Sequence, residues 1–468
     1  MYVIYLRQLH EYLTSFRAQI GFAVVITFFL LSGVLSALRI TQTQLDDAES
    51  QRNVAAKLAS VETVQQGART TLQARNSPTA TEFMSEGGLH WFWGTVSTTA
   101  ESGRNMGFGQ ARSRNYWMGS FERLDWTFIV RLIFSFLCVV LAYDSISGEA
   151  ERGTLRLMLT CPISRIRVAV AKYGAQLTVL GVLFTIGSMM SLVILMLMGS
   201  VQLSWTLVWK YFLYEAAVLV FLSQFLWFAI GISALVARSS SALVLLSLVW
   251  TSANIILPQS AYLLAMQTVE VPNRMRDAPS VYVRDVRQSL VASGGGLRDP
   301  IVAITDDYVI ERRYARLVNE AEQEADQLRQ LWLHRLMDRY AAARAITLLS
   351  PAYAFQYVVE ALLGTGVAKR QNFLEQGLDY RDQIRSLLRE RDAQDPQSPH
   401  VMFLPDFMSG KSLDGSHMPH FVESQLTTGE GLRHTVVPCV ILLAETLAAF
   451  LFGLWAVRRR EITDMTAG

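Results

Sequence analysis

The sequence predicts an all-α polytopic membrane protein with six transmembrane helices and a largely helical extracytoplasmic domain. Hydrophobic residues make up 51% of the 468 residues and the mean hydropathy is positive, which is typical of membrane proteins. Its apolar runs are of the length, about 20 residues, that a helix needs to cross a bilayer. They are too uniformly apolar for barrel strands, so helices are the only option. A formal net charge of +2 does not indicate the strongly basic surface that binds nucleic acid, so we expect no nucleic-acid partner.

The predicted elements follow one another in a simple order along the chain. Residues 1–19 form a polar, amphipathic N-terminal helix, and the first span follows at 20–39. Five more spans follow, with the third to fifth filling 174–265: 126–143, 174–199, 208–236, 241–265 and 435–457. Between and after the spans lie a first long loop at 40–125, a short loop at 144–173, a second long loop at 266–434 and a tail at 458–468.

The basic residues near the ends of the spans predict the orientation of the chain. Arg7 and Arg17 precede the first span, Arg238 lies between the fourth and fifth, and Arg458 begins a basic cap after the last. Several more basic residues fill the short loop. We therefore expect both termini and the short loop in the cytoplasm and the two long loops outside it. The first apolar run has full spanning length and no obvious cleavage site, so no signal peptide is predicted.

The first long loop should begin with a helix that continues the first span outward. A rough helical stripe predicts this helix over about 41–75, ending near Asn76 and Pro78. An aromatic-rich segment follows, with Trp91, Phe92, Trp93, Phe108, Tyr116 and Trp117. These rings are expected to form either a small packed core or interfacial belt, or a surface for substrate or partner.

The second long loop is predicted to contain three helices. Apolar positions in 304–347 alternate spacings of three and four, which predicts a helix of about 65 Å with charged outer faces. Further helices are expected at 352–363 and 371–391, and loop at 393–434. We expect these helices to be exposed to solvent and to carry many ion pairs. The apolar stripe of the longest helix needs a cover, which is either the other two helices or a second protein.

Arg131 lies several residues inside the second predicted span and Glu215 several residues inside the fourth, both near the outer leaflet. Such residues are costly in lipid and usually face a partner or a water-filled cavity. Three interpretations stay open, namely a structural pair between the two, a contact with substrate, and snorkelling of Arg131 to the headgroups.

The chain carries no recognisable catalytic or nucleotide-binding motif. Gly410-Lys411-Ser412 superficially matches a phosphate-binding loop, but Pro405 stands where a glycine is required. His400, His417 and His420 share one loop without a nearby thiol, so we expect no metal site. We expect no catalytic residues and no cofactor on this chain.

The short loop between the second and third spans has the most specific pattern in the chain. It resembles the corresponding cytoplasmic loop of ABC-2-type exporter permeases, in which an acidic residue, a Glu-x-Glu-x-Gly-Thr-Leu segment, a Pro-Ile-Ser-Arg segment and a lysine follow one another. The matching residues are Asp144, Glu149, Glu151, Gly153, Thr154, Leu155, Pro162, Ile163, Ser164, Arg165 and Lys172. In that family the loop forms the coupling helix that docks on the ATPase subunit.

The resemblance implies a mechanical role for this loop. Four charged side chains would fix the position of the helix by pairing with the polar rim of an ATPase groove: Glu149, Glu151, Arg152 and Arg156. Leu155, Leu157 and Leu159 would anchor it. Gly153 would allow a bend and Pro162 would end the helix. The alternative is an ordinary charged loop between spans.

The resemblance further implies a permease subunit of an ABC transporter in a bacterial inner membrane, surrounded by lipids. The long loops are similar to those of a subfamily with enlarged extracytoplasmic regions. The complete transporter would also contain a second permease copy or a sister permease. Two ATPase subunits would carry ATP and Mg²⁺. Export of an unidentified cargo is the first hypothesis. The rivals are force transmission to an extracytoplasmic partner protein, and a membrane sensor or scaffold with a ligand-binding ectodomain.

Overall fold

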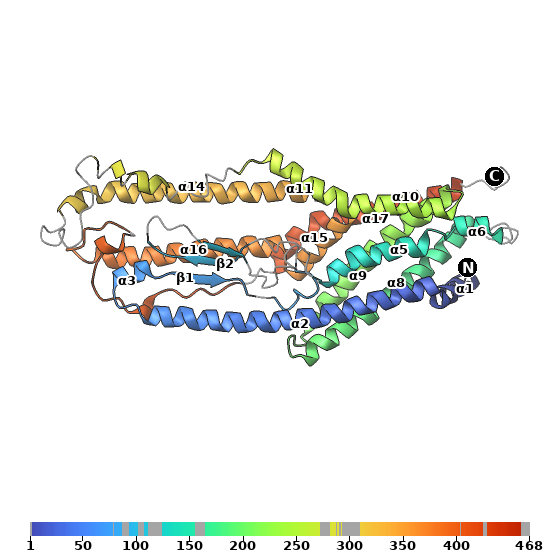
Figure 1. Ribbon diagram of the computed structural model, residues 1–468, viewed down its shortest axis with the longest axis horizontal. Helices are drawn as coiled ribbons and strands as arrows, with labels where there is room; N and C mark the ends of the chain where they lie inside the picture. Colours follow the sequence, from blue (N-terminus) through green and yellow to red (C-terminus); the bar gives the residue numbers. More distant parts are fainter. Residues whose placement is uncertain are drawn as a thin grey trace.

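The structure is a computed structural model, and helices dominate it. It describes residues 2–77, 79–86, 93–101, 107–110, 124–154, 164–271, 281–286, 288–289, 292, 309–402, 404–424 and 428–459. The molecule is elongated, with most helices running along its long axis (Figure 1). The short helices α1 (Tyr2–Thr14) and α6 (Ser147–Glu151) lie at one end, called here the loop end. The short helix α3 (Val64–Arg69) lies at the other, called the distal end.

Six helical segments are long and apolar enough to cross a membrane, which confirms the predicted number of spans. The first, third and fourth are single helices, α2 (Phe16–Ala59), α8 (Arg165–Leu197) and α9 (Trp205–Leu235). The last is α17 (Thr428–Arg459), which begins before the predicted apolar run. The second and fifth are helices interrupted by π-helical turns: α4 (Trp126–Phe128), η1 (Ile129–Phe134) and α5 (Ser135–Ala142), then α10 (Ser239–Thr251), η2 (Ser252–Ile256) and α11 (Leu257–Thr268).

An aromatic cluster around Trp126 forms the centre of the bundle. The Trp126 ring is fully buried and meets Phe29 edge to face at 6.0 Å and Phe83 at 5.0 Å between ring centroids. Its indole N–H donates to Ser191 Oγ at 3.0 Å, so the polar edge of the ring is satisfied within the core. The cluster joins the first three spans to the chain that precedes the second span.

Both π-helical turns lie against α15 (Pro351–Leu363), a short helix that the sequence predicted as a solvated ectodomain element. Instead α15 is buried in the same core as the spans, packed on α9 and α17, with Phe355 stacked on Phe221 at 4.6 Å. Ser350 Oγ donates to the Ala253 carbonyl of η2 at 2.6 Å. A π-turn leaves carbonyls without their usual helical donors, and this serine supplies one.

The helix that continues the first span ends earlier than predicted. We expected it to run to about residue 75, but α2 ends at Ala59 and the chain turns back through α3 into strand β1 (Leu72–Arg75). The turn buries Val61, Val64 and Ala68 in the distal core, which a straight helix would leave along one exposed stripe.

A small antiparallel sheet, which the sequence did not predict, follows this turn. Its order is β1–β2–β3, with β2 at Trp93–Thr98 and β3 at Gly107–Gln110, and Val96 is buried among distal residues. Most of the predicted aromatic segment lies outside the described residues, including Trp91, Phe92, Tyr116 and Trp117. The two interpretations of that segment therefore stay predictions.

The distal half contains two long helices, α14 (Val309–Thr347) and α16 (Val367–Ala393), close to the predicted ranges. Ion pairs join them as expected, but several of the charged side chains between them are buried rather than solvated, which corrects that part of the expectation, whereas others such as Arg316 are exposed. Asp326 of α14 accepts from Arg381 at 2.8 Å and from Arg385 at 2.6 Å, and both arginines are less than a tenth exposed. Burial alone would raise the pKa of Asp326, but the guanidiniums, Arg381 first, outweigh it and lower that pKa.

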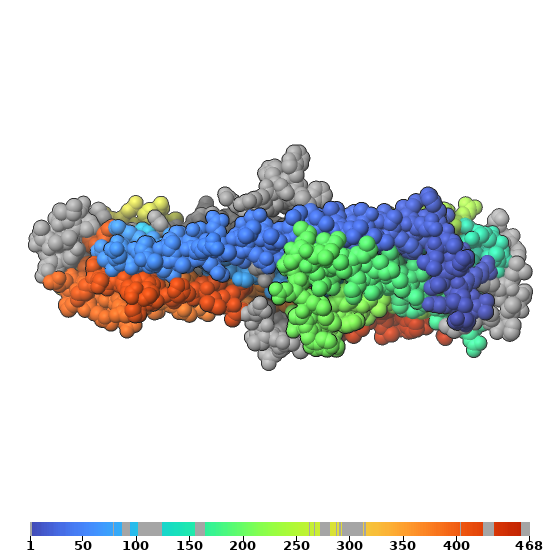
Figure 2. Space-filling model, turned by 90° about the horizontal axis from the view of Figure 1, so that it is seen from below, coloured from blue at the N-terminus to red at the C-terminus, as the bar shows by residue number. Residues whose placement is uncertain are grey.

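The end of α2 and the turn after it contact the loop between α16 and α17, called here the late loop, at the distal end. Val64 N–H donates to the Lys411 carbonyl at 3.2 Å, and Leu413 N–H donates to the Glu62 carbonyl at 2.8 Å. A Cβ added to Gly415 would lie 1.8 Å from the Leu58 carbonyl oxygen, so only glycine fits against the end of α2. Figure 2 shows α2 as a continuous blue band along the molecule, beside the later chain in orange in the distal half.

Candidate functional site

The segment that resembles a coupling helix begins at the loop end as the short helix α6. Gly153 follows it with φ of +73°, in the left-handed region that favours glycine after a helix, and a Cβ there would meet open space. Gly148 lies inside α6, where a Cβ would come 3.0 Å from that of Asp144. Both glycines therefore have local roles, one ending the helix and one permitting a close turn.

Glu149 faces into the molecule. Its carboxylate pairs with Lys172 of α8 at 2.6 Å, and the lysine side chain is only 2% exposed. Lys172 Nζ also donates to the Ser145 carbonyl at 2.6 Å. Because a buried ammonium needs several partners, this cluster fixes the turn before α6 to the start of the third span.

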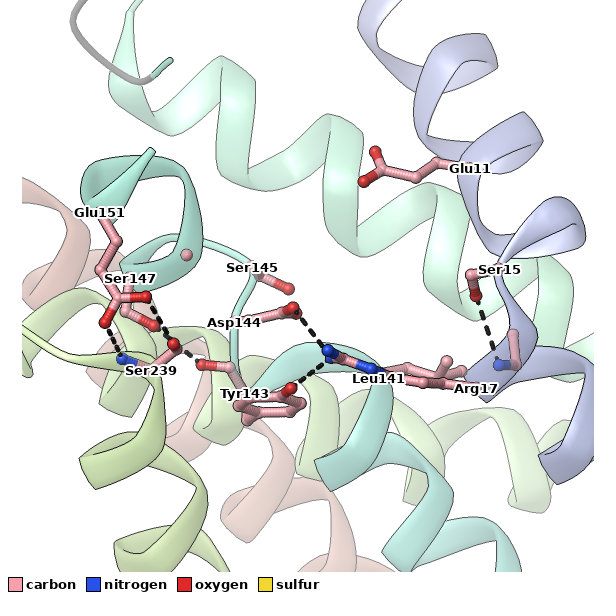
Figure 3. A network of polar contacts seen from close by, with 12 residues as sticks. Glu11, Ser15, Arg17, Leu141, Tyr143, Asp144, Ser145, Ser147, Glu151 and Ser239 are labelled. Carbon is pink, nitrogen blue, oxygen red and sulfur yellow. Dashed lines mark hydrogen bonds and ion pairs between the residues drawn. The ribbon is translucent and has the colours of Figure 1, made fainter. Parts of the chain in front are cut away.

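Glu151 makes a second internal link. Its carboxylate oxygens accept from the backbone N–H of Ser239 at 2.8 Å and from the Ser239 hydroxyl at 2.6 Å (Figure 3). Ser239 is the first residue of α10, so the carboxylate satisfies a free N–H group and interacts favourably with the positive end of the helix dipole. The end of α6 is thereby attached to the fifth span.

Two further contacts join the same loop to the remaining spans. The backbone N–H groups of Ile146 and Ser147 donate to Ser233 Oγ, near the end of α9, at 3.0 and 3.1 Å. Asp144 lies 3.6 Å from Arg17 at the start of α2, and Arg17 also hydrogen-bonds the Tyr143 hydroxyl (Figure 3). The loop is thus attached to spans one, three, four and five.

The remaining residues of the segment differ in exposure. Arg152 is exposed, Gly153 and Thr154 are half-buried, and Ser164 is exposed where its hydroxyl caps α8 by accepting from Arg167 N–H at 3.4 Å. Arg165 is half-buried at the first turn of α8. The other predicted docking residues lie outside the described residues: Leu155, Arg156, Leu157, Leu159, Pro162 and Ile163.

Sequence reasoning found the loop but missed what holds it. Ser233 and Ser239 are distant in sequence and belong to no motif, so no pattern predicted their contacts. One signal was present for Ser239, because a serine run at the start of an apolar helix is typical of a helix N-terminus.

The two intramembrane charges have separate neighbours. Arg131 donates to Gln356 of α15 and lies over the Tyr353 ring at 4.6 Å. Glu215 accepts from Thr185 of α8 at 2.5 Å. Each group therefore has a hydrogen-bond partner inside the protein, and the described contacts of the two lie on different helices. Neither the structural pair nor the substrate contact is tested by these distances.

The other sequence candidates have structural contacts in the distal loop. His400 Nδ1 lies 2.8 Å from the Asp392 carboxylate, and His417 Nδ1 lies 3.6 Å from Asp414. Within the described ranges, no three His, Cys, Asp or Glu side chains converge as metal ligands. Lys411, of the segment that superficially matches a phosphate-binding loop, lies 3.3 Å from Asp395.

These features define a multi-pass α-helical membrane protein whose loop between spans two and three is attached to several spans at once. A family model described as ABC-2 family transporter protein matches residues 8–461. The chain therefore belongs to the ABC-2 transporter family and is a membrane permease of an ABC transporter. Such permeases are generally non-enzymatic, and the family implies association with an ABC ATPase. No curated protein matches the chain.

Proposed function

We propose that this permease couples ATP hydrolysis on separate ATPase subunits to the export of a cargo, and that loop 144–173 is the docking segment. The observation that carries the proposal is the set of polar links from this one short loop to four spans. ATP and Mg²⁺ would be held by the ATPase alone. A displacement of the loop by the closing ATPase would then move several spans together.

The contacts divide the loop into two functional parts. Asp144, Glu149 and Glu151 use their carboxylates inside the chain, so they attach the loop to the bundle. Arg152 is exposed, although its Nε also donates to the Gly148 carbonyl at 3.0 Å, and with the segment that follows it in sequence it would face the ATPase. Charge reversal at Glu149 would therefore disturb the attachment of the loop, whereas reversal at Arg152 would disturb docking itself.

The assembly we propose is a dimer with a second copy or a sister permease in a bacterial inner membrane, with both termini in the cytoplasm. Support comes from exposed apolar side chains along the fifth and sixth spans, among them Leu248, Ile256, Val440 and Leu447. Such faces need lipid or a second permease to cover them.

The docking proposal is tested by Arg152→Glu, with Arg316→Glu on the exposed face of α14 as matched control. We expect the first variant to capture its ABC ATPase from solubilised membranes at least about tenfold less well, since charge reversal at an interface costs several kcal/mol. The control should capture it normally. Equal capture by both variants and the wild type would remove this loop as the docking site.

The attachment is tested separately by Ser239→Ala and Glu151→Gln. Both variants should bind the ATPase as the wild type does, because neither residue is proposed to touch it. ATP-dependent transport should fall several-fold, because the link from the loop to the fifth span is weakened. Full transport by both variants would show that this link does not transmit the ATPase movement.

A second candidate function, force transmission to an extracytoplasmic partner protein, is favoured by the long helices. The fifth span ends in α11, which packs along α14, and Arg339 Nε donates to the carbonyl of Val269, just after α11, at 2.8 Å. A fluorophore pair at Glu320→Cys and Lys57→Cys in vesicles with the ATPase separates the functions. Force transmission predicts an ATP-driven change in transfer efficiency without cargo movement, and export predicts cargo accumulation by the permease and ATPase alone.

A further inference from the structure

An acidic residue lies deep within the last span, and the proposed loop mechanism does not use it. Glu445 stands in the predicted span 435–457, with apolar residues on both sides along the helix. An ionised carboxylate near the centre of a membrane helix is costly, because lipid cannot replace the hydration of the charge. Such a residue therefore calls for a specific partner.

The partner is Gln224 of α9. Its amide Nε2 lies 3.4 Å from Glu445 Oε2, which is at the long end of hydrogen-bond distances. The Gln224 side chain is 6% exposed, and its Oε1 is buried without a hydrogen-bond partner in the described part of the chain. Glu445 itself is half-buried. The pair therefore contains one long hydrogen bond and one unsatisfied acceptor.

A protonated carboxyl group resolves this arrangement, whereas a carboxylate does not. A carboxylate only accepts hydrogen bonds, so it offers nothing to the Gln224 carbonyl. A carboxylic acid has one O–H donor and one C=O acceptor side by side. Facing a primary amide, it donates to the amide oxygen and accepts from the amide nitrogen. Both groups are then satisfied without placing a charge in the membrane.

Two lysines on neighbouring helices are engaged elsewhere. The helices packed against α17 include α8, α9 and α15. Lys210 of α9 donates to the Leu363 carbonyl at 2.7 Å, and Lys172 of α8 pairs with Glu149. Of the acids on these helices, Glu360 accepts from Gln356 at 2.7 Å and Glu215 accepts from Thr185. Within the described residues, the contact of Glu445 is with an amide and not with a cation.

Close helix packing separates the pair from the loop end. A Cβ added to Gly453 of α17 would lie 2.8 Å from the Trp227 carbonyl oxygen of α9, and one added to Gly231 would lie 2.7 Å from Phe452. Phe228 also stacks on Phe452 at 5.3 Å. These contacts hold α9 and α17 closely together between Glu445 and the loop end. We therefore expect a reagent to reach Glu445 from the lipid.

We propose that Glu445 is a membrane-embedded proton-binding site, a carboxylic acid paired with the Gln224 amide, and a site of modification by hydrophobic carbodiimides. The reaction needs the protonated form. The carboxyl oxygen bonds to the central carbon of the carbodiimide, one C=N bond becomes single, and the carboxyl proton goes to that nitrogen. An acyl shift from oxygen to nitrogen then gives a stable N-acylurea without loss of any atom.

The test treats the full chain in its native membrane with dicyclohexylcarbodiimide and locates the adduct by peptide mass spectrometry. We expect the adduct on Glu445 in the wild type, none at this position in Glu445→Gln, and an undiminished Glu445 adduct in Glu215→Gln. A water-soluble carbodiimide should modify the exposed Glu320 and spare Glu445. Modification of Glu445 by the water-soluble reagent would overturn the proposal, because the group would then face water.

A second measurement covers the case in which the reagent does not reach the site. Infrared difference spectra of the purified protein, wild type minus Glu445→Gln, should contain the C=O stretching band of a protonated carboxylic acid. Gln224→Leu should shift this band, since the amide partner is removed. Carboxylate bands in its place would show that Glu445 is ionised and would refute the proton site.

Discussion

Lys172 is a buried cation whose energetic role follows from its surroundings. Its ammonium is enclosed between Glu149 and the Ser145 carbonyl at the start of the third span. A buried ion pair adds little net stability, because the loss of hydration offsets the attraction, but removing one partner leaves an uncompensated charge. The pair therefore fixes where α6 lies more than it stabilises the fold.

Lys172→Met should destabilise the solubilised protein by roughly 3–5 kcal/mol, since Glu149 is left without its counter-charge. The double variant Lys172→Met with Glu149→Gln should recover most of this loss. Thermal unfolding in detergent measures both. Lys411→Met, which removes a cation that is 59% exposed, is the control and should cost no more than about 1 kcal/mol. A double variant as unstable as the single one would show that the two charges do not act as a pair.

At the scale of one helix, the buried face of α14 follows most of the apolar stripe that the sequence predicts, since its members Ala321, Ala325 and Trp332 are buried. Leu317, which also belongs to the predicted stripe, is 47% exposed, and the adjacent Val318 is fully buried in its place. The distal core and the late loop cover this face within the chain, through Met402 and Leu404 among others. Of the two helices expected to cover this face, α16 contributes to the distal core and α15 lies in the core of the spans instead.

Val318→Asp and Leu317→Asp form a matched pair of adjacent substitutions. The first places a carboxylate in the core and should cost about 3 kcal/mol or more, so that the distal half becomes sensitive to protease and accumulation falls. The second should change stability by about 0.5 kcal/mol at most, since it adds a charge to an exposed position. Limited proteolysis of the full chain reads out both. Equal sensitivity of the two variants would contradict the observed register.

The α14–α16 contact gives the distal half a defined response to acid. The folded pKa of Asp326 lies below its ordinary value of about 4, so its contribution is present above that pH and is lost as the pH falls through the folded pKa. Asp326→Asn should therefore cost about 1.5–3 kcal/mol near neutral pH and progressively less in acid. Unfolding measured at about pH 7 and about pH 3 tests this. A constant difference between wild type and variant would show that Asp326 does not carry the effect.

Several elements were predictable because the chain marks their ends. Pro351 and Gly364 bound α15, and the apolar runs predicted the six helices that are long and apolar enough to cross a membrane. Other features depend on contacts between distant segments. After the end of α2 at Ala59, Thr63 caps α3 by accepting from Gln66 N–H, which is a local signal that the sequence analysis missed, whereas the close approach of Gly415 to Leu58 follows only from the fold. At the loop, the motif located Glu149 and Glu151, but their internal partners follow only from the fold.

For the whole molecule, the orientation in the membrane stays a prediction that follows from the basic residues near the span ends. In a variant without Cys138, Cys161 and Cys439, an impermeant thiol reagent added outside should label Glu320→Cys and leave Arg152→Cys unlabelled. Both positions are exposed, and neither has the left-handed backbone of Gly153, so reactivity should depend on the side of the membrane. After permeabilisation both should react. Labelling of only Arg152→Cys from outside would show that the topology is the reverse of the predicted one.

Because the first span is one unbroken helix, the thickness of the bilayer should affect the structure at the distal end, far from the bilayer itself. A helix of 44 residues is about 66 Å long, and one end is held against the distal loop at Gly415. A thinner bilayer makes an apolar stretch tilt, and this rigid helix has no joint at which to absorb the tilt. The mismatch must then be taken up where α2 meets Gly415. Reconstitution in lipids of graded acyl length should accordingly change protease cleavage between residues 408 and 418, so that lipid composition is read out at the end farthest from the loop.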